Sequence, residues 1–172
     1  KVIKEKVLVF LLDRYENLIK EEKKIDLVVF KSLKINIKEL NLLEIHVKGK
    51  VLTSYINTQE GQLFLNAFKR VINIIDDDFL KHQGFRVPDL GLLNTKEELN
   101  LFKLIKNNKR FVEINDFSYL NKLSIPIKNF FDNVTIKDRN KKLRQNRINL
   151  LSMVNNKVNL LANFSMIIKG KE

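Results

Sequence analysis

The sequence predicts an all-α protein. Apolar residues recur at three- and four-residue spacing along several stretches, as they do in amphipathic helices. Only two prolines and five glycines occur in 172 residues, so few positions interrupt long helices. The apolar/polar alternation of a strand is limited to residues 134–136. A chain of this length is expected to form one helical domain spanning residues 1–172.

The first third predicts three helices. Residues 3–19 carry apolar side chains at helical spacing, and the charged run 20–24 is expected to end this helix. Asp26 is a candidate N-cap for a short helix through Leu33. Asn36 is a candidate cap for a longer helix through Tyr55. Glycine in a helix interior costs about 1 kcal/mol relative to alanine, so Gly49 indicates close packing or a kink.

A helix, a loop and a second helix are predicted in the middle third. Thr58 is expected to begin a helix that ends at residue 75. The segment 76–95 is predicted to be a loop or irregular insertion, because it contains two glycines and a proline. Thr95 and Glu98 have the spacing of a capping box, which should open a helix through Asn107.

The last third predicts three more helices. Asp116 is a candidate cap for a short helix to Leu123, and Pro126 suits the first turn of another short helix. That second helix carries the adjacent aromatic residues 130 and 131, of which at least one is expected in the core. The terminal helix is expected to begin near Asp138 and to run to Phe164.

Composition excludes several kinds of chemistry. With no cysteine, the chain has no disulfide and no thiolate metal site, a usage expected in the reducing cytoplasm. His46 and His82 lack the spacing of metal ligands, so no metal is expected. No glycine-rich phosphate loop and no nucleophile–base arrangement occurs, and we expect no catalytic residue. The apolar run at residues 7–12 is too short to cross a membrane.

The formal net charge of +12 has two interpretations. Lysine and arginine that neutralise phosphates release counterions, so a strongly basic chain favours a nucleic-acid partner. Alternatively, the charge follows from a composition rich in lysine, asparagine and isoleucine. The chain would then be a helical protein-interaction module.

The helix predicted over residues 60–75 has one face of amides and cations. At 3.6 residues per turn, five of its polar side chains fall within an arc of roughly 100°. Amides and cations donate hydrogen bonds to phosphates and base edges, so Lys69, Arg70 and Asn73 are candidate RNA-binding residues. The alternative is an ordinary solvated helix face.

The terminal helix places Arg147 within an apolar stripe. A buried guanidinium requires a carboxylate, and we assign Asp132 as its partner in a structural ion pair, with Asp138 as the alternative. Lys141 and Arg144 lie toward the outside of the same helix, where they are candidates for phosphate contacts. The stripe consists of Leu143, Leu150, Leu151, Val154, Val158 and Leu161.

Two sequence blocks carry a family resemblance. The terminal one reads FFDNVTI at residues 130–136, then Asp138, LRQNRINLL at 143–151 and ANFS at 162–165. The upstream block reads AFKRVINI at 67–74. In this order they resemble the carboxy-terminal anticodon-binding domain of bacterial glycyl-tRNA synthetase beta subunits. The arginyl-type synthetase anticodon domain is a related alternative that fits these blocks less well.

The resemblance implies a function. The fold would be a helical bundle like the DALR-type anticodon-binding domains of synthetases. The chain, which begins at Lys1 without methionine, would be a fragment of a longer beta subunit that binds the anticodon arm of glycine tRNA. Catalysis, with ATP and magnesium, would belong to the whole enzyme through its alpha subunit, and this fragment would hold no cofactor.

Overall fold

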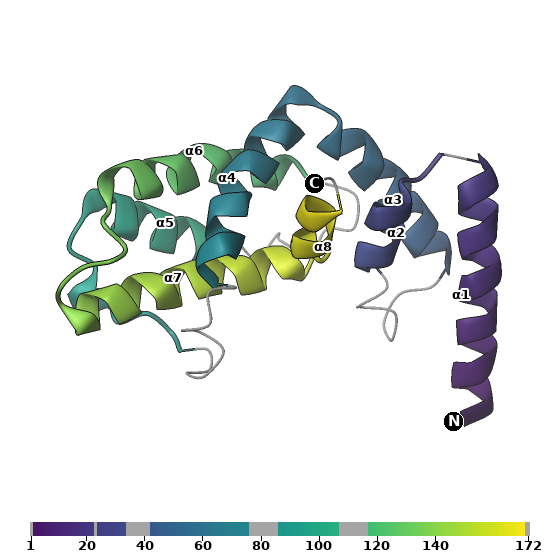
Figure 1. The fold of residues 1–172 in the computed structure, drawn as a ribbon, viewed down its shortest axis with the longest axis horizontal. Coiled ribbons are helices and arrows are strands. Elements are labelled where there is room, and N and C mark those ends of the chain that lie inside the picture. Colours follow the sequence, from purple (N-terminus) through teal and green to yellow (C-terminus); the bar gives the residue numbers. More distant parts are fainter. Residues whose placement is uncertain (1, 23, 34–41, 76–85, 107–116, 171–172) are drawn as a thin grey trace.

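The computed structural model describes residues 2–22, 24–33, 42–75, 86–106 and 117–170. All regular structure in these ranges is helical, which confirms the all-α prediction (Figure 1). The helices are α1 (Val2–Glu22), α2 (Leu27–Leu33), α3 (Leu42–Ile56), α4 (Gln59–Ile75), the short 3₁₀ helix η2 (Leu90–Leu92), α5 (Lys96–Lys106), α6 (Ser118–Asn133), α7 (Lys141–Asn159) and α8 (Phe164–Lys169).

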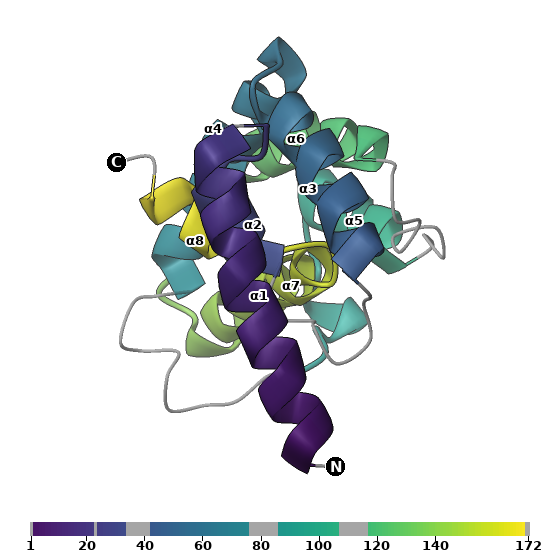
Figure 2. The same cartoon turned by 90° about the vertical axis from the view of Figure 1, so that its right-hand side faces the viewer.

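The helices α4 to α7 form a bundle, with α4 packed against α6 and α7, and α5 packed against the same two helices. Helix α8 packs on α4 and on α2, so it joins this bundle to the earlier helices α2 and α3. Helix α1 lies at the end of the molecule opposite the start of α7, where it packs on α2 and runs crosswise to α7 (Figures 1 and 2).

The main core is aromatic at its centre. Phe64 and Phe68, one helical turn apart on α4, stack at 5.3 Å between ring centroids. Phe164 of α8 meets both rings edge-on, at 5.4 and 6.1 Å. A second, smaller cluster lies beneath α1 and consists of Leu12, Ile19, Ile25, Phe30 and Ile45.

Two of the predicted local capping signals are confirmed. The Asp26 carboxylate accepts hydrogen bonds from the N–H groups of Val28 and Val29, so it caps α2. In the capping box, the Thr95 hydroxyl accepts from the Glu98 N–H at 3.1 Å, and the Glu98 carboxylate accepts from the Thr95 N–H at 2.8 Å. Gly49 is buried against Ile25, which confirms close packing there. The candidate caps Asn36 and Asp116 lie outside the described residues.

The prediction of two short helices around Pro126 was wrong. Residues 118–133 form one helix, with Pro126 inside it. Proline removes one backbone hydrogen bond and usually breaks a helix. Here a buried apolar stripe runs past the proline on both sides, and its packing holds the two halves in one helix. The stripe consists of Leu120, Leu123, Ile127 and Phe130.

The terminal helix also differs from the prediction. Helix α7 begins after Asn140, whose side chain accepts hydrogen bonds from the N–H groups of Lys142 and Leu143. Asp138 does not cap it, but accepts from the Asn140 N–H at 2.8 Å. The helix ends at Asn159, and Asn163 caps the separate helix α8. Residues 134–136 form no strand.

Candidate nucleic-acid interface

The polar face predicted on α4 is exposed as expected. Gln62, Asn66, Lys69, Arg70 and Asn73 are all exposed, whereas the opposite side of α4 is buried in the core. The angular argument from helical periodicity therefore placed these side chains correctly. Whether Lys69, Arg70 and Asn73 contact RNA stays a prediction.

Arg70 is held by side chains of α6. Its NH1 donates to the Asp132 carboxylate at 2.9 Å, and its guanidinium lies 4.5 Å from the centre of the Phe131 ring. Exposed ion pairs contribute about 0–1 kcal/mol, so the pair orients Arg70 more than it stabilises the fold. Asp132 of α6 thus places a carboxylate beside the polar face of α4.

The beginning of α7 presents further cations. Lys141 and Lys142 are exposed in the first turn, and Lys137 and Arg139 are exposed in the preceding loop. Arg144, one turn into the helix, is half-buried. The first turn of α7 contains no acidic residue, and helix amino termini attract anions. This end of α7 is therefore suited to contact phosphate.

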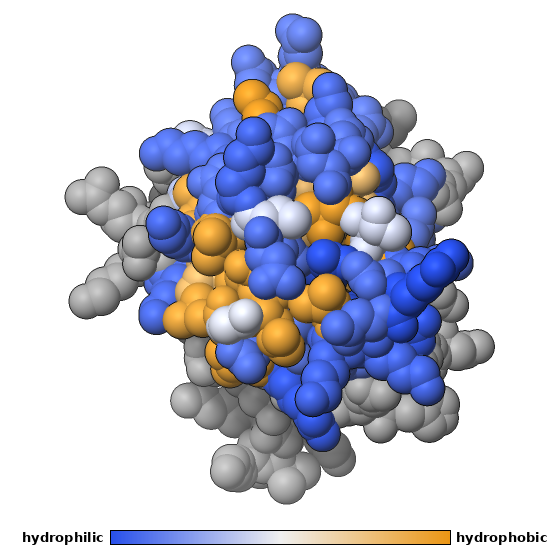
Figure 3. Space-filling model, turned by 90° about the vertical axis from the view of Figure 1, so that its left-hand side faces the viewer, coloured by the Kyte–Doolittle hydropathy of each residue, from blue (hydrophilic) through white to orange (hydrophobic). Residues whose placement is uncertain are grey.

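The two sets of predicted RNA-binding residues lie at different places. Lys69, Arg70 and Asn73 occupy the second half of α4, near the middle of the molecule, whereas Lys141 and Arg144 lie at the end away from α1 (Figure 1). The end of the molecule in Figure 3 is largely hydrophilic, with patches of apolar surface.

Arg147 is buried and paired with acids as predicted, but the partners are Glu98 and the alternative candidate Asp138 rather than Asp132. Only 6% of Arg147 is exposed. Its Nε donates to Glu98 at 2.7 Å, and its NH1 donates to Asp138 at 2.7 Å and to the Thr135 carbonyl at 2.8 Å. The assignment of Asp132 is wrong, because that carboxylate pairs with Arg70 of α4, whereas the alternative partner Asp138 is confirmed.

Glu98 and Asp138 both have pKa values lowered below their ordinary ranges. Burial alone would raise the pKa of Glu98, but hydrogen bonds from Arg147 and from the N–H groups of Thr95 and Asn94 outweigh it. The Asn140 N–H is the main cause of the lowered pKa of Asp138, followed by Arg147. These carboxylates therefore stabilise the fold while they are ionised.

This charge network predicts acid sensitivity. Carboxylates with lowered folded-state pKa values stabilise above their unfolded pKa of about 4 and lose that contribution as pH falls through the folded value. We expect the free energy of unfolding to decline progressively below about pH 4 in denaturant titrations. Glu98→Gln should be less stable at pH 7 and should show a shallower decline. The exposed Glu60→Gln is the control, and an unchanged acid response in Glu98→Gln would contradict the assignment.

Asn146 is a structural residue that the sequence reasoning missed. Its amide oxygen accepts from the Asp89 N–H at 2.7 Å, and its amide nitrogen donates to the Asp89 carbonyl at 2.9 Å. The buried amide thereby fixes the segment that precedes η2 against α7. The sequence did offer one signal for its burial: Asn146 is adjacent to Arg147 on the helix whose apolar stripe follows from the periodicity.

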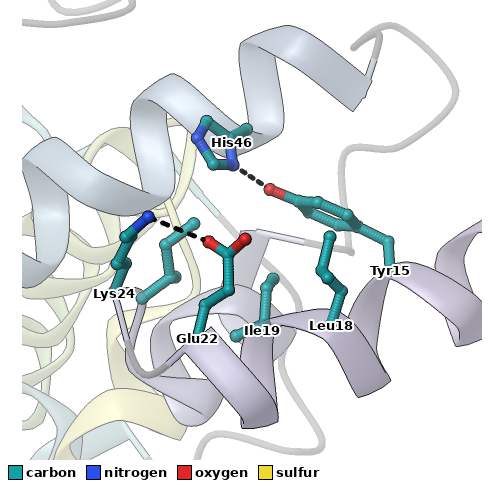
Figure 4. A pocket seen from close by; sticks show the side chains of 7 residues that line it. Tyr15, Leu18, Ile19, Glu22, Lys24 and His46 are labelled. Atoms are coloured by element: carbon teal, nitrogen blue, oxygen red, sulfur yellow. Dashed lines mark hydrogen bonds and ion pairs between the residues drawn. The ribbon is translucent and has the colours of Figure 1, made fainter.

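The joint between α1 and α3 contains a small cavity of about 50 Å³ (Figure 4). The Tyr15 hydroxyl and His46 Nδ1 form a hydrogen bond across it, and Lys24 pairs with Glu22 at 3.4 Å on its edge. Burial, with a further contribution from Glu22, raises the pKa of Tyr15. The cavity is far smaller than the sites that bind metabolites. We therefore interpret the side-chain contacts around it as structural contacts that attach α1 to the rest of the fold.

Two further findings concern the described part of the chain. No group of three or more histidine or acidic side chains within it could hold a metal ion. None of its helices combines the length and apolar character that membrane crossing requires.

Proteins similar in sequence to this chain are named glycine–tRNA ligase beta subunit. The glycine–tRNA ligase beta subunit of Rickettsia akari (strain Hartford) is 35% identical over 137 residues, which cover 75% of this chain and 20% of that protein. The beta subunit of Sulfurihydrogenibium sp. (strain YO3AOP1) is 32% identical over 181 residues, and that of Thermodesulfovibrio yellowstonii is 28% identical over 176; each match covers 96% of this chain and 25% of the relative. No family model matches the chain.

Proposed function

Because this chain belongs to the family of glycine–tRNA ligase beta subunits, we propose that it is the part of such a subunit that binds the anticodon arm of glycine tRNA. The chain spans only a fifth to a quarter of the length of these relatives. The activity of the whole protein therefore belongs to the proposal. In this proposal, the whole beta subunit acts together with an alpha subunit in the cytoplasm, and the enzyme joins glycine to tRNA with ATP and magnesium.

The exposed polar face of α4 is the observation that carries the proposal. It combines amides and cations on one rigid helix, and these groups can read unpaired bases and contact phosphates. Arg70 adds a planar guanidinium already positioned over the Phe131 ring. The cations at the start of α7 provide further phosphate contacts. Recognition at such a surface needs no cofactor within this part of the chain.

Titration of glycine tRNA onto the full beta subunit tests the proposal. We expect Lys69→Ala/Arg70→Ala and Lys141→Ala/Arg144→Ala each to weaken binding about tenfold at low salt. Each lost phosphate contact should reduce the slope of log affinity against log salt by about 0.7 if the contact is to single-stranded RNA. Asn73→Ala should instead change discrimination between glycine tRNA and other tRNAs.

The double variant Lys50→Ala/Lys103→Ala is the matched control, because it removes two exposed cations from α3 and α5. It should bind tRNA as wild type does. Unchanged affinity in both test variants would contradict the assignment of these surfaces. A weak salt response throughout would favour the rival interpretation of a protein-interaction module with compositional charge.

A further inference from the structure

A groove of about 320 Å³ lies between α4 and α6, where these two helices pack against each other. Its volume is at the lower end of the roughly 300–1,000 Å³ typical of small-ligand sites. Helix α4 contributes four lining residues and α6 contributes three: Leu63, Asn66, Ala67 and Arg70, and Ser124, Ile125 and Lys128.

Two of the lining side chains are apolar and exposed. Leu63 is 56% exposed and Ile125 is 67% exposed, and they belong to the two facing helices. Ala67, which is almost buried, contributes little side-chain volume between them. Two branched aliphatic side chains facing a shallow space provide a surface against which a flat, apolar-faced ligand can be buried.

The polar lining selects the charge of the ligand. Arg70 and Lys128 supply a cation from each helix; Arg70 also pairs with the Asp132 carboxylate at 2.9 Å, and no carboxylate is among the lining residues themselves. Asn66 supplies an amide that can donate and accept hydrogen bonds, and Ser124 supplies a hydroxyl. A ligand that complements this groove therefore has flat apolar faces, a hydrogen-bonding edge and adjoining negative charge.

We propose that this groove holds one unpaired nucleobase of the bound RNA. The base inserts between Leu63 and Ile125, its edge meets the Asn66 amide, and the flanking phosphates meet Arg70 and Lys128. Bases in single-stranded loops are available for such insertion, and their faces tolerate apolar partners. This inference rests on the proposed function and adds to it a defined base site. An amphipathic protein helix would require a longer apolar strip.

Two kinds of measurement on the full beta subunit test the groove. Glycine tRNA carrying 4-thiouridine at unpaired positions should form photo-crosslinks to peptides from α4 and α6. In titrations, Ile125→Glu should weaken tRNA binding by about tenfold or more, and Ile125→Ala by less. Ile125→Ala should leave the salt slope unchanged, because it removes no phosphate contact, whereas Lys128→Ala should make the slope shallower.

Leu43→Glu is the matched control, because Leu43 is 71% exposed on α3 and does not line the groove. It should bind as wild type does. If the Ile125 variants bind normally and no crosslink maps to α4 or α6, the groove proposal is overturned, while lost binding in the cation variants would still support the proposed function. Crosslinks confined to the rest of the subunit, with normal binding by the cation variants, would overturn both. An Ile125→Glu variant that loses only its association with the alpha subunit would assign the groove to a protein partner and overturn the proposal.

Discussion

Replacing Arg147 by alanine should lower the free energy of unfolding by about 3–5 kcal/mol. The change leaves the Glu98 carboxylate, which is 0% exposed, without its cation, and removes the NH1 donor from Asp138 and the Thr135 carbonyl. Breaking a buried ion pair is costly because the remaining charge stays out of water. Denaturant titration of the purified chain, followed by far-ultraviolet circular dichroism, measures the loss.

Arg147→Lys and Arg139→Ala provide the comparison. A lysine has one ammonium group and cannot reproduce donation from Nε and NH1 to two carboxylates, so Arg147→Lys should recover only part of the stability. Arg139 is exposed in the loop that precedes α7, and its removal should change stability little. Wild-type stability in Arg147→Ala would show that this network is not a structural support.

Replacing Gly61 by alanine should have a comparable effect, about 3 kcal/mol or more of lost stability. A Cβ at this position would lie 2.0 Å from the Tyr55 carbonyl oxygen and 2.9 Å from the Ile56 Cα. Both atoms belong to the backbone at the end of α3, so the two helices would have to separate at their shared corner. The melting temperature and the denaturation midpoint should both fall.

Gly49→Ala is the matched control for this substitution. A Cβ there would meet only the Ile25 side chain, at 3.1 and 3.2 Å, and that side chain can adjust. The helix would also gain about 1 kcal/mol of intrinsic propensity, so we expect little net change in stability. Equal destabilisation by the two substitutions would contradict the importance of the helix corner.

Features decided within one helical turn could be predicted from the sequence. The Asp26 cap and the Thr95–Glu98 capping box are local hydrogen-bond patterns, and the structure contains both. Helical periodicity also placed the polar face of α4 outward and Arg147 inward. These predictions needed no knowledge of which helices are neighbours.

Features that depend on distant packing could not be predicted in this way. One partner of Arg147, Asp138, is a nearby acid that the sequence offered, but the buried partner Glu98 comes from another helix and already serves the capping box, so a search of nearby sequence could not find it. The continuity of α6 through Pro126 depends on core packing at both sides. The groove between α4 and α6 likewise exists only once these helices are paired.

The contact between α2 and α8 has a consequence for how the chain folds. The Asn163 N–H donates to the Ser32 carbonyl at 3.1 Å, and Phe164 completes the aromatic centre formed by Phe64 and Phe68. Pairing segments so far apart in sequence is a non-local contact, and folds that depend on non-local contacts fold more slowly. Because α8 follows α4 in the chain, Phe64 and Phe68 can gain their contacts with Phe164 only after α8 has been synthesised.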